Sequence, residues 1–431
     1  MRPTGRLHIG HYFGALQNWV RLQDDPSYDC FYFIADWHAL TSDYADTSGV
    51  AQNVIEIATD YLGVGLDPKK CVIFQQSQIP EHAELHLLLS MVTPLGWLER
   101  VPTYKEALEN VKDKDLHTYG FLGYPCLQTA DIVIYSQEGM SLVVPVGEDQ
   151  VSHVELSREI VRRFNSFYEI RIADELFSDS GRVAMERLAL LTYTREWNAS
   201  SSHERPLPPE SRVDFVSRIR REILTEGLDN FLERIKVHKD VLRFLSVRRE
   251  LCEPEAMLTQ TPRIPGLDGR KMSKSYGNAI MLSESDGDIR AKTKVMVTDP
   301  ARKRRSDPGN PDVCPVYDWH KLFAPRDAHE ALTEEGKATL KWSADGCRTA
   351  GIGCIECKAA MADNLIKWIT PIRERRVQYE KNPKQVLHVI DEGSQRARSV
   401  AVKTMERVRE AVFAWQKKRN EIADESSVAK A

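Results

Sequence analysis

Near its N-terminus the chain reads Pro3-Thr4-Gly5-Arg6-Leu7-His8-Ile9-Gly10-His11, and residues 11–22 have the apolar spacing of an amphipathic helix. The spacing of His8 and His11 places both imidazoles on one side of the first turn. A helix N-terminus offers free N–H groups and a partial positive charge, which favour a phosphate. Gly10 would let an adenine ring approach the backbone closely. The segment predicts a nucleotide site, and an N-terminal turn with incidental histidines is the alternative.

A second basic motif follows much later in the chain. The Pro/Gly-containing stretch 264–270 leads into Lys271-Met272-Ser273-Lys274-Ser275. Such a cationic segment is suited to a polyphosphate, because it can stabilise the charge that develops on a leaving pyrophosphate. A carboxylate substrate needs no general base, since it is already a nucleophile at neutral pH. In isolation this run would usually be a surface loop, so its meaning depends on the histidine motif.

The first 165 residues alternate strand-like and helix-like segments. Apolar runs at 30–34, 71–75 and 142–146 read as strands, and 50–62 and 81–91 read as helices. This alternation predicts an α/β domain with a Rossmann-like, doubly wound parallel sheet and helices on both faces. Ligands of such folds bind at the carboxyl ends of the strands.

Two further groups of polar residues lie in this part of the chain. Gly147-Glu148-Asp149-Gln150 follows the predicted strand 142–146, where a carboxylate is well placed for ribose hydroxyls. Upstream, Tyr124, Gln128 and Asp131 share one face if their segment is helical. That face could bind the amino group of an amino acid, or a hydrogen-bond donor on its side chain. A buried structural network is the alternative.

The rest of the chain is predicted to be mainly helical. We expect a catalytic domain over residues 1–169, a helical insertion over 170–257, the lysine loop region over 258–285 and a helical C-terminal domain over 286–431. The overall charge is -4, but residues 290–431 contain 28 Lys and Arg against 20 Asp and Glu, so residues 1–289 carry -12. A basic C-terminal third suggests a polyanion at that end, although a solvated helical surface explains it equally well.

Neither a bilayer-spanning apolar run nor a signal-peptide pattern is evident, so we expect a cytoplasmic protein. Four of the eight cysteines, Cys30, Cys71, Cys126 and Cys252, are scattered and read as reduced thiols. The other four, Cys314, Cys347, Cys354 and Cys357, cluster with the spacing of a metal site rather than of a disulfide framework.

Taken together, these motifs resemble the bacterial tryptophanyl-tRNA synthetases, a family of class I aminoacyl-tRNA synthetases. The resemblance covers roughly 1–165, 254–312 and 360–415, and its most specific motifs are residues 2–12, Ala35-Asp36-Trp37-His38-Ala39, residues 144–150 and residues 269–275. It implies ATP-dependent formation of tryptophanyl-adenylate, with Mg²⁺ on the phosphates, and transfer of L-tryptophan to tRNA(Trp). It also implies a C-terminal domain that binds the anticodon, and a homodimer with its contact around residues 91–124.

The resemblance assigns roles by motif. Catalysis would involve His8, His11, Lys271 and Lys274. The ATP site would be lined by Arg2, Pro3, Thr4, Gly10, His11, Gly147, Glu148, Asp149, Ile264, Lys271, Met272, Ser273, Lys274 and Ser275, with assistance from Lys105. Asp131 would accept the indole N–H, and Tyr124, Gln128, His38 and Gln150 would hold the amino and carboxylate ends of tryptophan. Val144 and Val146 would pack against the ring.

The four-cysteine motif resembles that of a subset of these synthetases with a [4Fe–4S] cluster. Cys347-x6-Cys354-x2-Cys357 matches that motif, with Cys314 as the fourth thiolate, although extra residues around 334–341 lengthen the gap between Cys314 and Cys347. A four-thiolate zinc site fits the same ligands, and unliganded thiols are the third possibility.

Three alternatives for the function stay open. Tyrosyl-tRNA synthetases are the close rival, because Tyr-x3-Gln-x2-Asp also resembles their tyrosine-binding helix, whereas Gly-Glu-Asp-Gln and the flanking valines favour tryptophan. The others are a nucleotidyltransferase and a non-charging, synthetase-like RNA-binding regulator. The family has a strand before the Pro-Thr-Gly turn and this chain starts inside that turn, which supports the regulator. The intact His8, His11, Lys271 and Lys274 argue against it.

Overall fold

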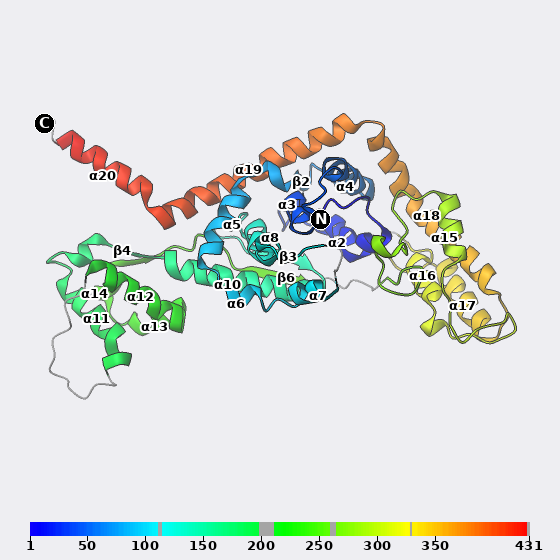
Figure 1. Ribbon diagram of the computed structural model, residues 1–431, viewed down its shortest axis with the longest axis horizontal. Coiled ribbons are helices and arrows are strands. Elements are labelled where there is room, and N and C mark those ends of the chain that lie inside the picture. Colours follow the sequence, from blue (N-terminus) through cyan, green and yellow to red (C-terminus); the bar gives the residue numbers. More distant parts are fainter. Residues whose placement is uncertain (111–113, 198–210, 259–263, 328–329, 429–431) are drawn as a thin grey trace. The chain divides into compact units, whose positions relative to one another are not determined.

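The computed structural model in Figure 1 describes residues 1–110, 114–197, 211–258, 264–327 and 330–428. The chain forms two compact units, each built from several sequence segments. The first unit comprises Met1–Ile79, Pro145–Asp149 and Met257–Ala397. The second unit comprises Pro80–Val144, Gln150–Ala256 and Arg398–Ala431.

The first unit begins with a short helical run and a parallel strand pair. Its N-terminal elements are α1 (Ile9–His11), a π-helical turn (Tyr12–Leu16), α2 (Gln17–Leu22), β1 (Phe31–Ile34), α3 (Asp36–Asp43), α4 (Val50–Val64), β2 (Val72–Gln75) and a 3-10 turn (Gln76–Gln78). Its C-terminal elements are a 3-10 turn (Lys274–Tyr276), α15 (Asp286–Lys294), a 3-10 turn (Pro311–Val313), α16 (Pro315–Phe323), α17 (Glu334–Arg348) and α18 (Cys354–Glu380). Helix α19 (Pro383–Phe413) continues from this unit into the second.

Strands β1 and β2 confirm the parallel pairing expected at 30–34 and 71–75. Their register runs from Phe31 opposite Val72 to Ile34 opposite Gln75. Parallel neighbours need a crossover connection, and α3 and α4 supply it. Helix α4 ends at Gly65, whose φ of 107° is a left-handed conformation that glycine adopts without strain.

The predicted helix over 11–22 is present, but it contains a π-helical turn at Tyr12–Leu16. Single π turns are rare and are often found at functional sites. This turn directly follows the histidine motif.

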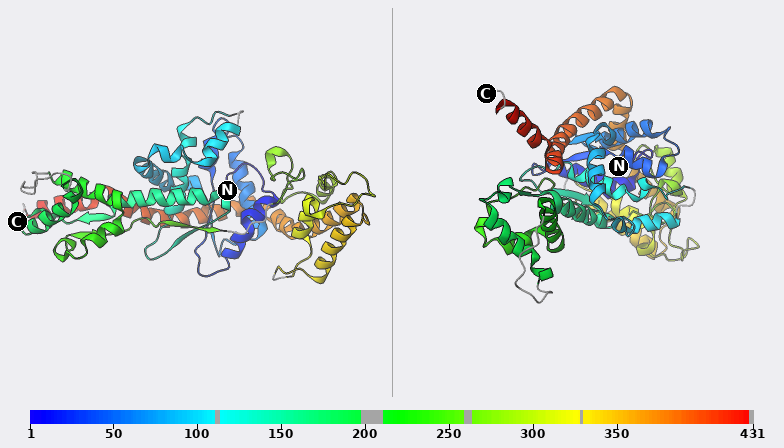
Figure 2. Two further views of the ribbon diagram at one scale, coloured as in Figure 1. Left: turned by 90° about the horizontal axis from the view of Figure 1, so that it is seen from below. Right: turned by 60° about the vertical axis from the view of Figure 1, so that its left-hand side comes forward.

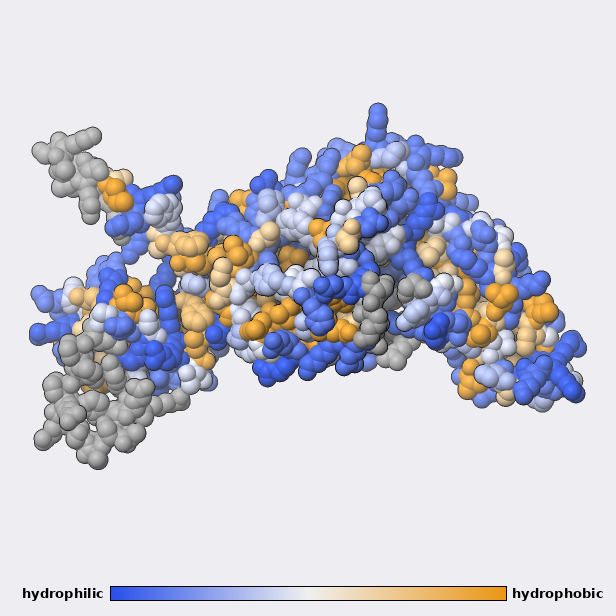
Figure 3. Space-filling model, in the orientation of Figure 1, coloured by the Kyte–Doolittle hydropathy of each residue, from blue (hydrophilic) through white to orange (hydrophobic). Residues whose placement is uncertain are grey.

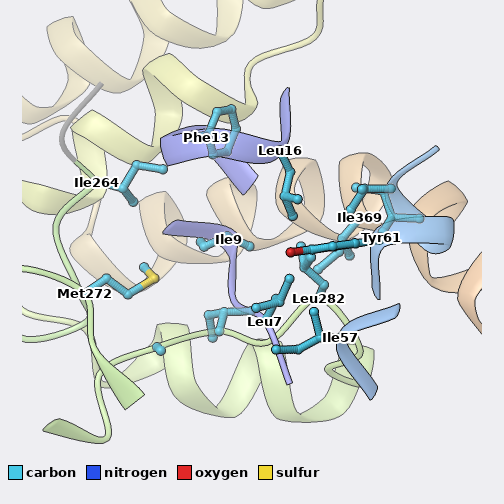
Figure 4. Close-up of a cluster of buried hydrophobic side chains, with 14 of the residues drawn as sticks. Leu7, Ile9, Phe13, Leu16, Ile57, Tyr61, Ile264, Met272, Leu282 and Ile369 are labelled. Atoms are coloured by element: carbon cyan, nitrogen blue, oxygen red, sulfur yellow. The ribbon is translucent and has the colours of Figure 1, made fainter. Parts of the chain in front are cut away.

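One hydrophobic cluster holds the first unit together around the histidine motif. Figure 4 shows Leu7 and Ile9 in this cluster with Ile57 of α4 and Ile369 of α18. Met272 of the lysine motif belongs to the same cluster and is buried. Apolar residues on either side of the polar motif residues therefore bring the two motifs into one core.

The second unit is mainly helical. Its elements are α5 (Glu81–Val92), α6 (Leu95–Leu98), α7 (Pro102–Asn110), α8 (Tyr119–Leu122), α9 (Tyr124–Val133), α10 (Val151–Tyr168), β4 (Ile170–Ile172), a 3-10 turn (Asp174–Phe177), α11 (Arg182–Trp197), α12 (Arg212–Glu226), α13 (Leu228–Ile235), α14 (Lys239–Leu242), β5 (Leu245–Val247) and α20 (Trp415–Val428). Strand β3 (Leu142–Val146) pairs with β6 (Pro254–Leu258), and a 3-10 turn (Glu148–Gln150) follows β3. The helix expected at 81–91 is confirmed as α5.

Residues 170–247 have a small core of their own. Strand β4 pairs antiparallel with β5, from Ile170 opposite Val247 to Ile172 opposite Leu245. Helices α11 to α14, drawn in green in Figure 2, complete this segment. The periodic apolar residues on α12 and α13 are buried in the cluster, namely Phe215, Ile219, Ile223, Phe231 and Ile235. The helical spacing read from the sequence is confirmed at these positions.

Hydrophilic residues cover most of the face shown in Figure 3, with hydrophobic residues scattered among them. Across the described ranges, no helix combines the length and the apolar character that crossing a bilayer requires.

Candidate active site

The backbone of the histidine motif is held against a segment more than 270 residues away in the sequence. The Ile9 N–H donates to the Ile280 carbonyl over 3.0 Å, and the Leu282 N–H donates to the Leu7 carbonyl over 2.9 Å. Residue His8 forms an antiparallel bridge with Met281 between these bonds. The chain that follows the lysine motif therefore fixes the histidine motif.

The imidazoles of His8 and His11 lie on the same side of the first turn, as their spacing predicts. Their rings stack with centroids 3.7 Å apart, and the backbone N–H of His8 donates to His11 Nδ1 over 3.2 Å. Burial, together with the nearby Lys274 ammonium, lowers the pKa of His8 to about 4. Burial also lowers the pKa of His11 to about 3, with further contributions from His8 and Lys274. Both rings are therefore neutral near pH 7 in the free protein, and they can donate hydrogen bonds without carrying charge.

Gly10 is needed for a reason that the sequence did not reveal. A Cβ atom at this position would lie 2.9 Å from His8 Nδ1 and 3.4 Å from Met272 Sδ. The glycine therefore makes room for the His8 ring and for Met272.

The side chain of Lys274 contacts Thr4, which lies a few residues before the two histidines in the sequence. Its Nζ donates to the Thr4 carbonyl over 3.0 Å and lies 3.4 Å from Thr4 Oγ1. Burial lowers the pKa of Lys274, while Asp60 acts in the opposite direction. Lys271 is exposed on the same segment. The convergence of imidazoles and an ammonium expected from the two motifs is thus present within the first unit.

Asn278 braces the lysine motif and was not identified from the sequence. Its Oδ1 accepts the Ser273 N–H over 2.8 Å, and its Nδ2 donates to the Lys271 carbonyl over 3.1 Å and to Asp268 Oδ1 over 2.7 Å. Its side chain is only 3% exposed. A buried amide that bonds the loop backbone on both sides restricts the loop's conformations. An asparagine shortly after a lysine run is too common a pattern to have signalled this.

In the second unit, Asp131 lies on α9 in a buried hydrogen-bonded chain. Its Oδ1 is 2.6 Å from His82 Nδ1, and His82 Nε2 is 2.8 Å from the Tyr135 hydroxyl. Burial raises the pKa of Tyr135 well above its usual value, so this phenol stays protonated and can donate to His82. His82 can then donate from Nδ1 to the carboxylate, which leaves Asp131 as an oriented acceptor. Asp131 was predicted from the sequence, whereas His82 and Tyr135 carry no sequence pattern that links them to it.

Tyr124, at the start of α9, is also held by neighbours that the sequence did not identify. Its hydroxyl lies 2.6 Å from Thr103 Oγ1 and 3.1 Å from His153 Nε2. Thr103 Oγ1 is in turn 2.9 Å from His153 Nε2. These contacts orient the phenol, and Gln128 is half-buried on the same helix.

The remaining predicted residues are distributed over both units. In the first unit, the backbone N–H of His38 on α3 donates to Gln76 Oε1, and Arg2 Nη1 donates to Ser42 Oγ. Three predicted residues of this unit are buried, namely Pro3, Ile264 and Met272. Val146 ends β3, and Gly147 and Glu148 follow it. In the second unit, Val144 and Gln150 are half-buried and Lys105 is exposed on α7. The side chains of Asp149 and Ser275 lie outside the described residues.

The four clustered cysteines all belong to the first unit, and three of them affect the pKa of the fourth. Burial and the neighbouring Cys314, Cys347 and Cys354 raise the pKa of Cys357 to about 12. Arg302 Nη1 lies 3.8 Å from Cys347 Sγ, and His320 Nε2 lies 3.3 Å from Cys357 Sγ. In the part of the chain that is described, no group of three or more possible ligands has the geometry of a bound metal ion. The four residues are free cysteines, and their sulfur is the donor type that holds iron–sulfur clusters and structural zinc.

Comparison with known proteins identifies the family. A model of tRNA synthetases class I (W and Y) matches residues 1–191 and 235–368. The chain belongs to this family. A tryptophan–tRNA ligase of Ralstonia nicotianae is 44% identical over 96% of this chain and 96% of its own length. The enzyme of the same name from Thermotoga maritima is 42% identical over 96% and 97%.

A solved structure supports the same assignment. The tryptophanyl-tRNA synthetase of Campylobacter jejuni, crystallised with ADP and tryptophan, has a TM-score of 0.64 at 25% identity and covers 96% of this chain and 98% of its own. The prediction of a Rossmann-like α/β fold with a helical C-terminal part is thereby confirmed for this class I synthetase.

Proposed function

We propose that this class I synthetase is a tryptophan–tRNA ligase. It activates L-tryptophan with ATP to tryptophanyl-adenylate and pyrophosphate, and then transfers tryptophan to the 3′ end of tRNA(Trp). The observation that carries the proposal is the convergence of His8, His11 and Lys274 in one unit, since these groups suit a triphosphate. Tryptophan–tRNA ligases that are 44% and 42% identical over nearly the whole chain support the choice of amino acid.

The proposed chemistry depends on positioning and charge. The tryptophan carboxylate attacks the α-phosphate in line, and the neutral imidazoles of His8 and His11 donate hydrogen bonds to the phosphate oxygens. Lys271 and Lys274 stabilise the negative charge that develops on the departing pyrophosphate. Mg²⁺ would neutralise charge on the phosphate oxygens when it is bound with ATP. Thr4, Gly10, Gly147, Asp149 and Ile264 would line the nucleotide site.

Tryptophan would be selected by an oriented acceptor. Asp131 would accept the indole N–H while His82 holds the carboxylate, and Tyr124, Gln128, His38 and Gln150 would bind the amino and carboxylate ends. A site built around such an acceptor rejects analogues without a donor by roughly 10⁴-fold or more. Phenol also donates, so Val144 and Val146 would have to distinguish indole from tyrosine by shape.

Pyrophosphate exchange with tryptophan and with tyrosine, measured in parallel, tests this proposal. We expect exchange with tryptophan to exceed exchange with tyrosine by about 10³-fold or more, because the pocket must discriminate by donor position and shape. Tyrosine-only exchange would reassign the substrate. Absence of exchange with either amino acid would favour a non-charging RNA-binding protein.

We further propose that Cys314, Cys347, Cys354 and Cys357 hold a [4Fe–4S] cluster, with a four-thiolate zinc ion as the alternative. Support comes from the spacing of the four cysteines in the sequence and from the Arg302 guanidinium, whose Nη1 lies 3.8 Å from Cys347 Sγ and suits an anionic centre. Such a group would order the loops that carry its ligands.

Metal analysis of protein purified without oxygen tests the cysteine proposal. We expect a brown protein that absorbs at about 400 nm and contains about four iron ions per chain. The Cys347→Ser variant should lose the iron, while Cys252→Ser, the control outside the cluster, should keep it. A colourless preparation with about one zinc ion per chain would replace the cluster by zinc, and a metal-free protein would reject both.

The remaining proposals concern partners and organisation. We propose a cytoplasmic homodimer whose contact lies around residues 91–124, where Met91, Leu95 and Tyr119 are exposed hydrophobic side chains. The basic helical domain at 286–431 would bind the tRNA anticodon. Residues 170–257 would form an insertion outside the catalytic geometry.

A further inference from the structure

A buried arginine on α18 is surrounded by carboxylates of the first unit. Arg376 is 1% exposed, and its Nε donates to Asp60 Oδ1 over 2.6 Å. Its other nitrogens pair with Glu56 of α4 and with Glu380, one turn further along α18. Gly63 of α4 lets the two helices approach, since a Cβ there would lie 3.0 Å from Arg376 Cβ.

Asp60 uses its second oxygen for a different partner. Its Oδ2 accepts the Leu7 N–H over 2.7 Å, and Leu7 directly precedes His8. Asp60 is 1% exposed, so this bond is made away from solvent. A buried backbone N–H without a partner costs free energy, and here a side chain from α4 supplies that partner.

The two contacts of Asp60 depend on each other. Burial raises the pKa of the Asp60 carboxyl, whereas the Arg376 guanidinium and the Leu7 N–H favour its charged form. Without the guanidinium, the buried carboxyl would tend to take up a proton, and a protonated oxygen is a poorer acceptor. Arg376 therefore keeps Asp60 in the state that anchors Leu7.

We infer that Asp60 and Arg376 are positioning residues for ATP: Arg376 on α18 orients Asp60, and Asp60 fixes the backbone from which His8 and His11 project. The inference rests on the proposed ATP-dependent activation. Because α18 begins at Cys354, the helix that carries two of the clustered cysteines also sets the position of the histidine motif. Neither residue touches a reacting atom, so the effect should appear in ATP binding rather than in tryptophan binding.

A pair of double variants separates positioning from simple packing. Asp60→Leu/Arg376→Met fills the space with apolar atoms and leaves the Leu7 N–H without its acceptor. Asp60→Asn/Arg376→Gln is equally uncharged but keeps an amide oxygen for Leu7, and the glutamine amide reaches about as far as Arg376 Nε. Replacing a buried ion pair by uncharged groups is often tolerated, so both proteins should fold.

We expect the apolar double variant to raise KM for ATP about tenfold over the amide variant, while KM for tryptophan stays within about twofold. Isothermal titration with ATP should show the same ratio in Kd without any turnover. Equal ATP affinities in the two variants would overturn the inference, and so would a parallel loss of ATP and tryptophan affinity, which would indicate general loosening.

Two further measurements keep the outcomes distinct. If the apolar variant fails to fold, Arg376→Lys is the milder test, because it keeps a charge but loses Nε; we expect a rise in the ATP Kd of about threefold, and no rise would overturn the inference. If the wild-type protein binds ATP but exchanges pyrophosphate with no amino acid, the proposed function fails while the comparison of ATP Kd values still decides the role of Asp60.

Discussion

The Asp131→Asn variant should lose about 100-fold in kcat/KM for tryptophan, because a hydrogen bond to a charged group contributes up to about 3 kcal/mol. The carboxylate has two acceptor oxygens, and His82 Nδ1 already lies 2.6 Å from one of them. An amide has a single acceptor oxygen, so its N–H₂ group must face either His82 or the indole N–H. Steady-state pyrophosphate exchange at varied tryptophan concentration measures this loss.

Tyr135→Phe is the matched control for Asp131. It removes only the outer hydroxyl of the chain that runs through His82, and Asp131 remains a carboxylate. We expect a loss of less than about tenfold in kcat/KM for tryptophan, since one hydrogen bond in the supporting chain is removed. KM for ATP should stay unchanged in both variants. A comparable rise of the ATP and tryptophan KM values in Asp131→Asn would mean that Asp131 only supports the fold.

The Lys274→Ala variant should lose about 10²- to 10³-fold in kcat for adenylate formation, the range found when one donor to a developing charge is removed. The Lys274 ammonium is the group that joins the lysine motif to the turn before His8. KM for tryptophan should change little, since the lysine meets charge on the departing pyrophosphate. Rapid-quench measurement of adenylate in a single turnover separates this step from product release.

Arg290→Ala is a suitable control for Lys274. Arg290 belongs to the same unit, is exposed and pairs with Asp363 on the surface. Its substitution therefore removes one positive charge without changing a group that contacts the histidine motif. We expect kcat for adenylate formation to change by less than about twofold, because an exposed surface ion pair contributes little free energy. If both variants lost activity equally, the effect would be one of overall charge and not of the lysine motif.

The lowered pKa of His8 and His11 also has consequences for stability. Both groups have pKa values below the usual 6.5 in the folded chain, at about 4 and about 3. The unfolded chain therefore binds more protons below about pH 6.5, so their contribution to stability is complete above that pH. It decreases as the pH falls from about 6.5 toward 4 and 3. The stability that carboxylates contribute when they are paired in the folded state would be lost at lower pH values.

Much of the fold and of the candidate site was predictable because the relevant interactions are local. The stacking of His8 on His11 follows from their spacing in one turn, and α5 follows from helical periodicity and begins at Glu81, where that periodicity places it. Helix α9 contains Tyr124, Gln128 and Asp131, as the expected common face of these residues requires. The parallel pairing of β1 with β2 follows from apolar runs separated by helices. The π-helical turn after His11 was not predictable, since nothing in Tyr12–Leu16 distinguishes it from an ordinary helix.

The amino-acid sequence by itself determined which side chains could bind a nucleotide, since motif spacing within one turn or loop sets their chemistry and local geometry. Only the tertiary structure decided which distant groups hold them. Asp60 and Arg376 are 316 residues apart, and Asp131 and His82 are 49 apart, so no periodic pattern links either pair. The reason is physical: a buried polar group needs a partner, and the packing of α4, α18 and their neighbours determines which residue supplies it.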